Sequence, residues 1–383
     1  MRTRPVRVLV LEGEGMPALS AVRSLGRAGC EVDVVAAGRG APALASRYCR
    51  RGFVEPSIRE ADAWRAFLIE RLKAERYDAL LLNGQSSAEC VGPHRHLFDP
   101  LVPTLLPDPE SFRVALDKTL TVRLAQRLGI PCPRTRFPAD VAALRRYAGD
   151  LDYPQVVKGP GGSGSARVRF ASAPAQLLER FSEVARLDEV DGSPPPMVQE
   201  KIGGESVCYA ALYRDGRPLA EFMWRRLLEY PATGGPTAAG ESIRDDEVRA
   251  HCRSLCSALR WSGPADIEFK RDLRDRVPKL MEINPRFWGP LELAVRCGVD
   301  FPRLYVKACL GRPFAPVLTY AVGRRLSFLS PRILLGASAP SERLPLARDL
   351  CRPDRFDIDW RDLKPTLRQM RATWWDYRKL RRV

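Results

Sequence analysis

Long apolar runs are absent from this chain of 383 residues. No stretch of about eighteen consecutive apolar residues occurs, which argues against a membrane-spanning helix. The opening residues, MRTRPVRVLVLEGEG, pass from two arginines straight into a strand pattern and lack the apolar stretch and cleavage site of a signal peptide. We therefore expect a cytoplasmic protein with no transmembrane span, long enough for two or three domains.

Paired cysteine motifs are absent as well. The ten cysteines are scattered without a CxxC pair. Cys252 and Cys256 would share one face of a helix, but His251 would point about 100° away from Cys252. A zinc site lacks the further ligands that it needs, so we interpret the cysteines as buried free thiols of a reducing compartment.

Acidic residues are fewer than basic ones, 46 against 62, which leaves a formal charge of +16. Such a balance raises the question of nucleic acid or an anionic surface as partner, but the excess is spread along the chain and gives no strong indication of nucleic acid. Only residues 368–383 concentrate it, around Trp374, Trp375 and Tyr377. That pattern is compatible with RNA stacking, with an anionic membrane surface, or with a terminal helix held by its aromatic residues, which is the favoured interpretation.

Two short strand patterns, ADIEFK and MEINPRFWG, carry oxygen-bearing side chains. The first contains Glu268, and the second contains Glu282 and Asn284. Because side chains alternate along a strand, Glu282 and Asn284 would lie on one face, and an antiparallel neighbour carrying Glu268 would complete a set of oxygen ligands suited to Mg²⁺. Arg286 places a cation beside that set. The alternative is a hairpin with a solvated polar face.

The first hundred residues alternate strand and helix patterns, which predicts an opening α/β unit with a parallel sheet. GEG at 13–15 begins a GxGxxG pattern, but Ala18 stands where the third glycine should be, so a dinucleotide site is not favoured. The expected elements are strands at 6–13, 30–37 and 77–84 and helices at 18–28 and 60–75.

Two lysines lie in contexts that favour phosphate binding. Lys118 lies in a capped amphipathic pattern that predicts one helix from residue 107 to Gly129. Lys158 ends a strand and precedes a glycine-rich loop, whose backbone N–H groups can hold anionic oxygens. A solvated helix lysine and an ordinary hairpin turn are the alternatives.

The middle of the chain predicts two strands around the turn RDGRP, at 197–226, then an irregular segment at 225–243 and a helix at 244–260. Long irregular segments inside a compact domain tend to be functional. Arg225, Arg226 and Glu241 are therefore further candidates for contacts with phosphate or substrate.

The order of these motifs resembles the ATP-grasp superfamily, in particular its carbamoyl-phosphate-synthase-like and D-alanine–D-alanine-ligase-like branch. The resemblance rests on ExNPR with an acidic residue fourteen positions upstream, on a DK-helix-GIPxPxT series, and on the glycine loop after the second lysine. It covers about residues 1–312. It implies an α/β fold in which two α+β lobes clasp ATP after a parallel α/β pre-ATP-grasp domain, with domains at 1–104 and 105–312, a flexible lid at about 133–195, and a C-terminal extension with a basic aromatic helix at 313–383.

The resemblance also implies roles for individual residues. Two Mg²⁺ ions, which Mn²⁺ could replace, would be held by Glu268, Glu282 and Asn284. ATP would be bound by Lys118, Lys158, Gly162, Ser163, Gly164, Glu200, Lys201, Ile202 and Glu205. The catalytic residues would be Lys158, Arg226 and Arg286.

The implied activity is that of an ATP-dependent carboxylate–amine ligase, which forms an acylphosphate and releases ADP and phosphate. Its substrates would be a small-molecule carboxylate and an amine, and a homodimer is left open. Two alternatives remain: a nucleotide-binding regulatory protein with a degenerate site, and a protein that associates with RNA or a membrane through its basic tail. The sequence does not identify the two substrates.

Overall fold

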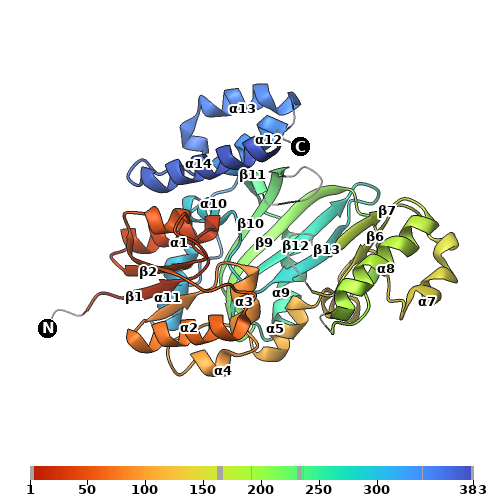
Figure 1. Ribbon diagram of the computed structural model, residues 1–383, viewed down its shortest axis with the longest axis horizontal. Helices are drawn as coiled ribbons and strands as arrows, with labels where there is room; N and C mark the ends of the chain where they lie inside the picture. The colour runs from red at the N-terminus through yellow and green to blue at the C-terminus, as the bar shows by residue number, and fades with distance from the viewer. Residues whose placement is uncertain are drawn as a thin grey trace.

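The computed structural model describes residues 4–161, 167–190, 192–230, 235, 237–338 and 340–380, and its elements form three sheets (Figure 1). The first sheet is parallel, with the order β3-β2-β1-β4. Its two inner strands are mostly apolar and nearly fully buried, as expected for parallel strands covered on both faces. This confirms the opening α/β unit. Its elements are β1 (Arg7–Val10), α1 (Met16–Arg27), β2 (Glu31–Ala36), η1 (Pro42–Ala45), β3 (Cys49–Val54), α2 (Ala61–Ala74) and β4 (Ala79–Leu81).

The second sheet has six antiparallel strands in the order β13-β12-β9-β10-β11-β14. Asp215 and Gly216 both have positive φ, which is the geometry of a tight hairpin turn between β9 and β10; the predicted turn is confirmed. The strands are β9 (Gly204–Arg214), β10 (Arg217–Glu229), β11 (Thr237–Ser242), β12 (Gly263–Asp272), β13 (Pro278–Asn284) and β14 (Arg325–Ser327).

The expectation of an irregular segment at 225–243 is wrong for most of its length. Residues up to Glu229 continue β10, and Thr237–Ser242 form β11, which pairs with β10 across two register shifts. Residues 231–234 and 236 lie outside the described part of the chain. The alanines of β11, Ala238 and Ala239, are buried within the sheet.

The third sheet is small, with the order β5-β8-β6-β7, and α8 packs on β6 and β7. Figure 1 shows this lobe on the opposite side of the large sheet from the first sheet. Its elements are β5 (Thr135–Arg136), α7 (Val141–Arg145), η2 (Ala148–Asp150), β6 (Gln155–Lys158), β7 (Val168–Ala171), α8 (Pro174–Val190) and β8 (Met197–Glu200).

The single helix predicted from residue 107 to Gly129 is wrong, because the chain forms α5 (Pro109–Leu116) and α6 (Lys118–Arg127). Asp117 leaves helical geometry, and its side chain accepts hydrogen bonds from the N–H groups of Thr119 and Leu120. Asp117 therefore caps α6. The break places Lys118 in the first turn of α6, where its N–H donates to the carbonyl of Pro160 (2.8 Å).

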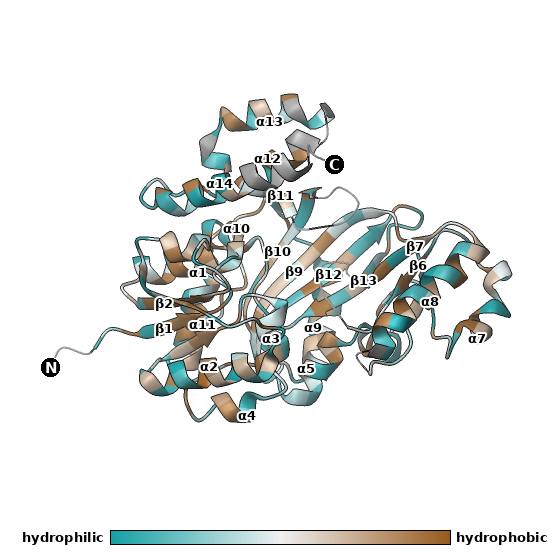
Figure 2. Cartoon of the chain, viewed as in Figure 1, coloured by the Kyte–Doolittle hydropathy of each residue, from teal (hydrophilic) through white to brown (hydrophobic). Residues whose placement is uncertain are grey.

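The large sheet separates two apolar cores. One face of β9 and β10 packs toward α1, α10 and α11, and the other packs on α9, which buries Cys252 and Cys256 as free thiols. The shared helix face of these two cysteines is thus confirmed. Figure 2 shows hydrophobic residues along the strands of these sheets. The remaining helices of the first 312 residues are α3 (Gln85–Val91), α4 (Arg95–Phe98), α9 (Asp246–Ala258), α10 (Leu291–Arg296) and α11 (Phe301–Cys309).

The C-terminal segment contacts the rest of the molecule at several places, which include the large sheet and the first sheet's domain. β14 pairs with β11, which extends the large sheet beyond residue 312. Asp362 accepts hydrogen bonds from Arg23 Nε (3.1 Å) and Ser46 Oγ (2.7 Å), which ties the segment to the first sheet's domain. No helix in the described ranges is long and apolar enough to cross a membrane. The last elements are α12 (Leu329–Ser338), η3 (Pro340–Glu342), α13 (Arg343–Leu350), η4 (Pro353–Arg355) and α14 (Leu363–Leu380).

Candidate active site

The paired strands β12 and β13 bring four polar side chains together. Glu268 lies opposite Glu282, and Asp266 lies opposite Asn284 in the antiparallel register. The Nδ2 group of Asn284 donates to Glu282 Oε1 (3.3 Å) and to Asp266 Oδ2 (3.4 Å). The predicted antiparallel pairing and the shared face of Glu282 and Asn284 are therefore confirmed.

Asp266 is a member of this cluster that the sequence analysis missed. It is buried, and its Oδ1 atom receives no hydrogen bond from the described residues. Burial, reinforced by the charge of Glu268, raises the pKa of Asp266 to about 7. The signal was available, because Asp266 precedes Glu268 by two residues and strand alternation puts both on one face.

Arg226 reaches the cluster from β10 and forms an ion pair with Glu268. Arg226 also lies 3.6 Å from Glu229 in the same strand. Burial raises the pKa of Glu268, and the charge of Arg226 acts in the opposite direction. The guanidinium thus neutralises Glu268 in this conformation.

The oxygen donors of the cluster match the chemistry that Mg²⁺ requires, since carboxylate and amide oxygens are its usual protein ligands. The unpartnered Oδ1 atom of Asp266 adds a buried acceptor to this set. However, the described residues contain no group of three or more His, Cys, Asp or Glu side chains placed to hold a metal ion. The chemical type of these side chains therefore fits Mg²⁺. The ion pair between Arg226 and Glu268 has to open before Glu268 can bind a cation.

Two lysines lie beside Glu282. Lys118 Nζ is 3.9 Å from Glu282 Oε2. Burial lowers the pKa of Lys158 to about 8; Lys118 adds to this decrease and Glu282 opposes it. Burial alone would raise the pKa of Glu282, but the charges of Lys118 and Arg286 outweigh burial and lower it. Cations from α6, from β6 and from the segment after β13 therefore act on one carboxylate.

Arg286 connects the cluster to the first sheet. Its Nη1 group donates to Asp266 Oδ2 (3.3 Å) and to the carbonyl of Phe287 (2.9 Å). The next peptide N–H, of Phe287, donates to the carbonyl of Leu82 at the end of β4 (3.4 Å). The arginine is thus held where the carboxyl ends of parallel strands meet, which is the common ligand-binding edge of such sheets.

Glu12 is a second residue that the sequence analysis missed. It follows β1 with φ of 56°, a conformation that residues other than glycine rarely adopt. Its carboxylate accepts a hydrogen bond from Ser87 Oγ. Burial raises the pKa of Glu12, while the Ser87 hydrogen bond and the charge of Arg286 act in the opposite direction. The GEG motif after a strand was the only sequence signal for this residue.

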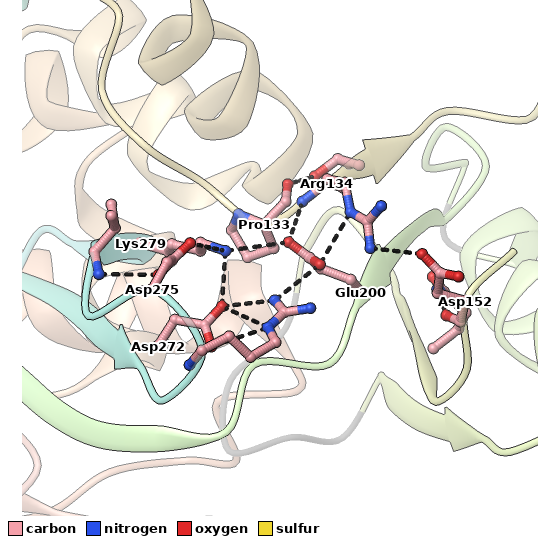
Figure 3. A network of polar contacts seen from close by, with 11 residues as sticks. Pro133, Arg134, Asp152, Glu200, Asp272, Asp275 and Lys279 are labelled. Atoms are coloured by element: carbon pink, nitrogen blue, oxygen red, sulfur yellow. Dashed lines mark hydrogen bonds and ion pairs between the residues drawn. The ribbon is translucent and has the colours of Figure 1, made fainter.

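The side chain of Glu200 lies in a different network, at the junction of the small and large sheets (Figure 3). It accepts hydrogen bonds from Arg134 N (3.0 Å), Arg134 Nε (3.1 Å) and Arg274 Nη2 (2.9 Å), and Lys279 Nζ lies 3.5 Å away. Burial alone would raise the pKa of Glu200, but these donors outweigh it and lower the pKa to about 2. Its carboxylate is therefore fully engaged within the protein.

The backbone of residues 200–202, which the resemblance assigns to ATP binding, is partly engaged too. The N–H of Glu200 donates to Arg134 O (3.0 Å), and the N–H of Lys201 donates to Pro154 O (3.1 Å). The Lys201 ammonium lies 5.2 Å from the centre of the Phe170 ring, and Ile202 is buried. An adenine contact here has to use the carbonyl groups or the peptide after Lys201.

Glu205 lies on β9 and is paired by Arg225, which also binds Glu241 on β11; the distances are 3.1 Å and 2.6 Å. Arg325 approaches Glu241 from β14 at 3.0 Å. These residues form a cross-strand network on the large sheet. The remaining candidates, Gly162, Ser163 and Gly164, lie outside the described residues.

Comparisons with known proteins show what the chain is similar to. A family model described as "ATP-grasp in the biosynthetic pathway with Ter operon" matches residues 232–326, which include β12 and β13. The uncharacterized protein y4rH of Sinorhizobium fredii is 27% identical over 219 residues, which are 54% of this chain and 44% of that protein. The chain spans less than half the length of the curated relatives that it matches.

Solved structures share the fold at low sequence identity. Biotin carboxylase from Campylobacter jejuni, crystallised with a β,γ-ATP complex, matches with a TM-score of 0.67 and 15% identity over 83% of this chain and 74% of that chain. L-amino acid ligase from Bacillus licheniformis matches with a TM-score of 0.59 and 18% identity over 82% of this chain and 76% of that chain. The chain has the ATP-grasp fold.

Proposed function

We propose that this protein is an ATP-dependent carboxylate–amine ligase that releases ADP and phosphate. The observation that carries the proposal is the convergence of Lys118, Lys158 and Arg286 on Glu282, from three separate segments of the chain. Cations aimed at one carboxylate-rich point suit the phosphates of a nucleotide, because phosphoryl transfer depends chiefly on positioning and electrostatic stabilisation.

The chain's own residues supply most of the proposed mechanism. Lys118 and Lys158 bind phosphate oxygens, and the Gly162–Ser163–Gly164 loop covers them. The adenine contacts Lys201, Ile202 and the carbonyl group of Glu200. Glu205 binds the ribose after Arg225 has left it and stays paired with Glu241 alone. Glu268, Glu282 and Asn284 would hold Mg²⁺, which when bound neutralises phosphate charge. Arg286 contacts the transferred phosphoryl group.

Arg226 has two roles in this proposal. Before the nucleotide binds, it neutralises Glu268, since a buried carboxylate without a partner is strongly disfavoured. If Glu268 were to bind a divalent cation, the guanidinium of Arg226 would be free to turn within reach of the cluster. Arg226 then binds the carboxylate substrate or the acylphosphate, because a guanidinium can donate two parallel hydrogen bonds to a carboxylate or a phosphate.

The unit formed by the first sheet supplies the second substrate's site in this proposal, with Glu12 beside Arg286. We propose the division into residues 1–104, 105–312 and 313–383, with the lid at about 133–195 and a cytoplasmic location. An amine substrate attacks the acylphosphate after phosphate transfer. Closure of the lid excludes water from that reactive species.

A regulatory nucleotide-binding protein with degenerate catalysis is a second candidate, because Arg226 occupies Glu268 in this structure. Turnover separates the two. The purified chain is incubated with Mg·ATP and an amino-acid library while ADP and AMP are measured. The ligase proposal predicts Mg-dependent ADP release with at least one acid and amine pair; nucleotide binding without turnover supports the regulatory protein, and AMP formation contradicts the acylphosphate route.

A further inference from the structure

Helix α14 turns its apolar side away from the protein. The exposed apolar residues are Leu363, Leu367 and Met370, with Trp360 just before the helix, and they are between 39% and 66% exposed. At 100° per residue, Leu363, Leu367 and Met370 fall within one narrow stripe. A surface helix normally buries such a stripe against the core.

The side of α14 next to this stripe, about 90° around the helix, is polar and buried. Thr366, Gln369 and Thr373 are between 3% and 9% exposed. The Thr373 hydroxyl forms a hydrogen bond of 2.5 Å with Ser330 on α12, and it also donates to the carbonyl of Gln369 (2.8 Å). The helix is therefore fixed to the molecule through its polar side, and the orientation of its apolar stripe follows from specific contacts.

Basic residues flank the apolar stripe. Lys364, Arg368 and Arg371 are exposed, and no acidic residue occurs from 363 to 375. Residues 361–383 contain eight basic and two acidic side chains. Figure 1 shows α14 at the periphery of the molecule, beside α12 and away from the small sheet of the candidate active site.

We propose that α14 binds the surface of an anionic lipid bilayer, lying in the interface with Leu363, Leu367 and Met370 inserted among the lipids. An interfacial helix needs an apolar face flanked by lysine and arginine, because lipid burial and attraction to anionic headgroups act together. The positive charge of α14 and of the whole chain favours an anionic lipid surface over a second copy of the chain as the partner. Two copies meeting through α14 would bring two basic helices and two net charges of +16 together, whereas an anionic surface neutralises them.

The test uses the full chain and sedimentation with vesicles of phosphatidylcholine, with or without phosphatidylglycerol. We expect binding only to vesicles that contain phosphatidylglycerol, and weaker binding at high salt. The double variant Leu367→Ser, Met370→Ser should bind roughly tenfold more weakly or worse, because it removes inserted apolar area. Lys364→Glu with Arg371→Glu should also lose roughly tenfold or more, through repulsion from the headgroups.

The matched control is Leu273→Ser, which removes a leucine that is 67% exposed in the turn between β12 and β13. It should bind vesicles as the parent does, and circular dichroism should show that all variants are folded. Failure of the parent to bind phosphatidylglycerol vesicles overturns the proposal, as does unchanged binding by the serine double variant. A lipid-independent dimer that this double variant disrupts would assign the stripe to a second copy, and RNA binding without vesicle binding would assign the basic flank to nucleic acid.

Discussion

Two clusters of carboxylates lie at opposite ends of the β12–β13 hairpin, and the pKa values of Asp266 and Glu268 at one end are shifted in the direction opposite to those of Glu200 and Asp272 at the other. At one end, burial raises the pKa of Asp266 to about 7 and raises that of Glu268. At the other, hydrogen bonds and cations overcome burial and lower the pKa of Glu200 to about 2 and that of Asp272 still further. Both groups lie near arginines, so charge alone does not separate them.

The difference lies in how completely each carboxylate is satisfied. Arg134, Arg274 and Lys279 surround Glu200 with donors, whereas Asp266 has one unpartnered oxygen among the described residues and a carboxylate neighbour. A satisfied buried network fixes structure. Buried carboxylates whose pKa values are raised and whose oxygen atoms are not all hydrogen-bonded are typical of a functional site.

The largest expected effect is at the unsatisfied cluster. Glu282→Gln keeps the side-chain shape but removes the charge that Lys118 and Arg286 face. We expect Mg-dependent ADP release to fall by a factor on the order of a thousand, because a metal-ligand charge contributes several kcal/mol to the transition state. Steady-state ADP assays measure this. Glu70→Gln, at an exposed helix position, is the control, and activity of Glu282→Gln near the parent's would remove Glu282 from the metal site.

A smaller loss is expected for Lys158→Ala. Removing this buried cation beside Glu282 and Lys118 should weaken ATP binding and slow transfer together, each by roughly 10- to 100-fold, because the contact is made in both ground and transition states. Isothermal titration calorimetry and single-turnover kinetics separate the two effects. Lys73→Ala, at an exposed position of α2, should change neither. Unchanged ATP affinity in Lys158→Ala would make Lys158 an ordinary hairpin residue.

The satisfied network predicts a loss of stability instead. Glu200→Gln should lower the free energy of unfolding by about 2 kcal/mol. This loss is smaller than the loss expected for a fully buried ion pair, because Arg134 and Arg274 are partly exposed. The folded-state pKa of about 2 lies below the usual value of 4.5. The contribution is therefore present above pH 4.5 and is lost as the pH falls toward 2. Urea unfolding at several pH values measures it, with the exposed pair variant Glu247→Gln as control; a pH-independent difference would contradict the assignment.

The smallest effect is expected at Asp266. A carboxyl whose folded-state pKa is raised from 3.8 to about 7 destabilises the fold progressively as the pH rises through that range. Asp266→Asn should therefore be more stable than the parent at pH 8. The gain in the free energy of unfolding should be only about 1 kcal/mol, because the amide loses the charged contact with Arg286. The gain should vanish near pH 4. Thermal unfolding at both pH values shows this; a variant that is less stable at pH 8 would mean that Asp266 is satisfied.

The sequence was most informative where local patterns determine the result. Strand alternation placed Glu282 and Asn284 on one face, and the RDGRP turn was also predicted correctly. The same rule could have found Asp266. Asp117 carried a capping signal for α6 that the continuous amphipathic pattern obscured, so one helix was predicted in place of two.

Tertiary contacts set the limits of that prediction. The ion pair between Arg226 and Glu268 joins β10 to β12, and Glu12 approaches Arg286 from a strand end far away in the sequence. No local spacing encodes either approach. Composition misled at β11, where glycine and threonine suggested a loop but pairing with β10 and β14 forms a strand.

Interception of the activated acid tests the central claim most directly. The chain is incubated with Mg·ATP, a carboxylic acid that supports ADP release, and hydroxylamine, and the products are identified by mass spectrometry. The account predicts the hydroxamate of that acid together with ADP, because hydroxylamine attacks the acylphosphate in place of the amine. AMP and pyrophosphate, or a phosphorylated product that resists hydroxylamine and every amine, would contradict it.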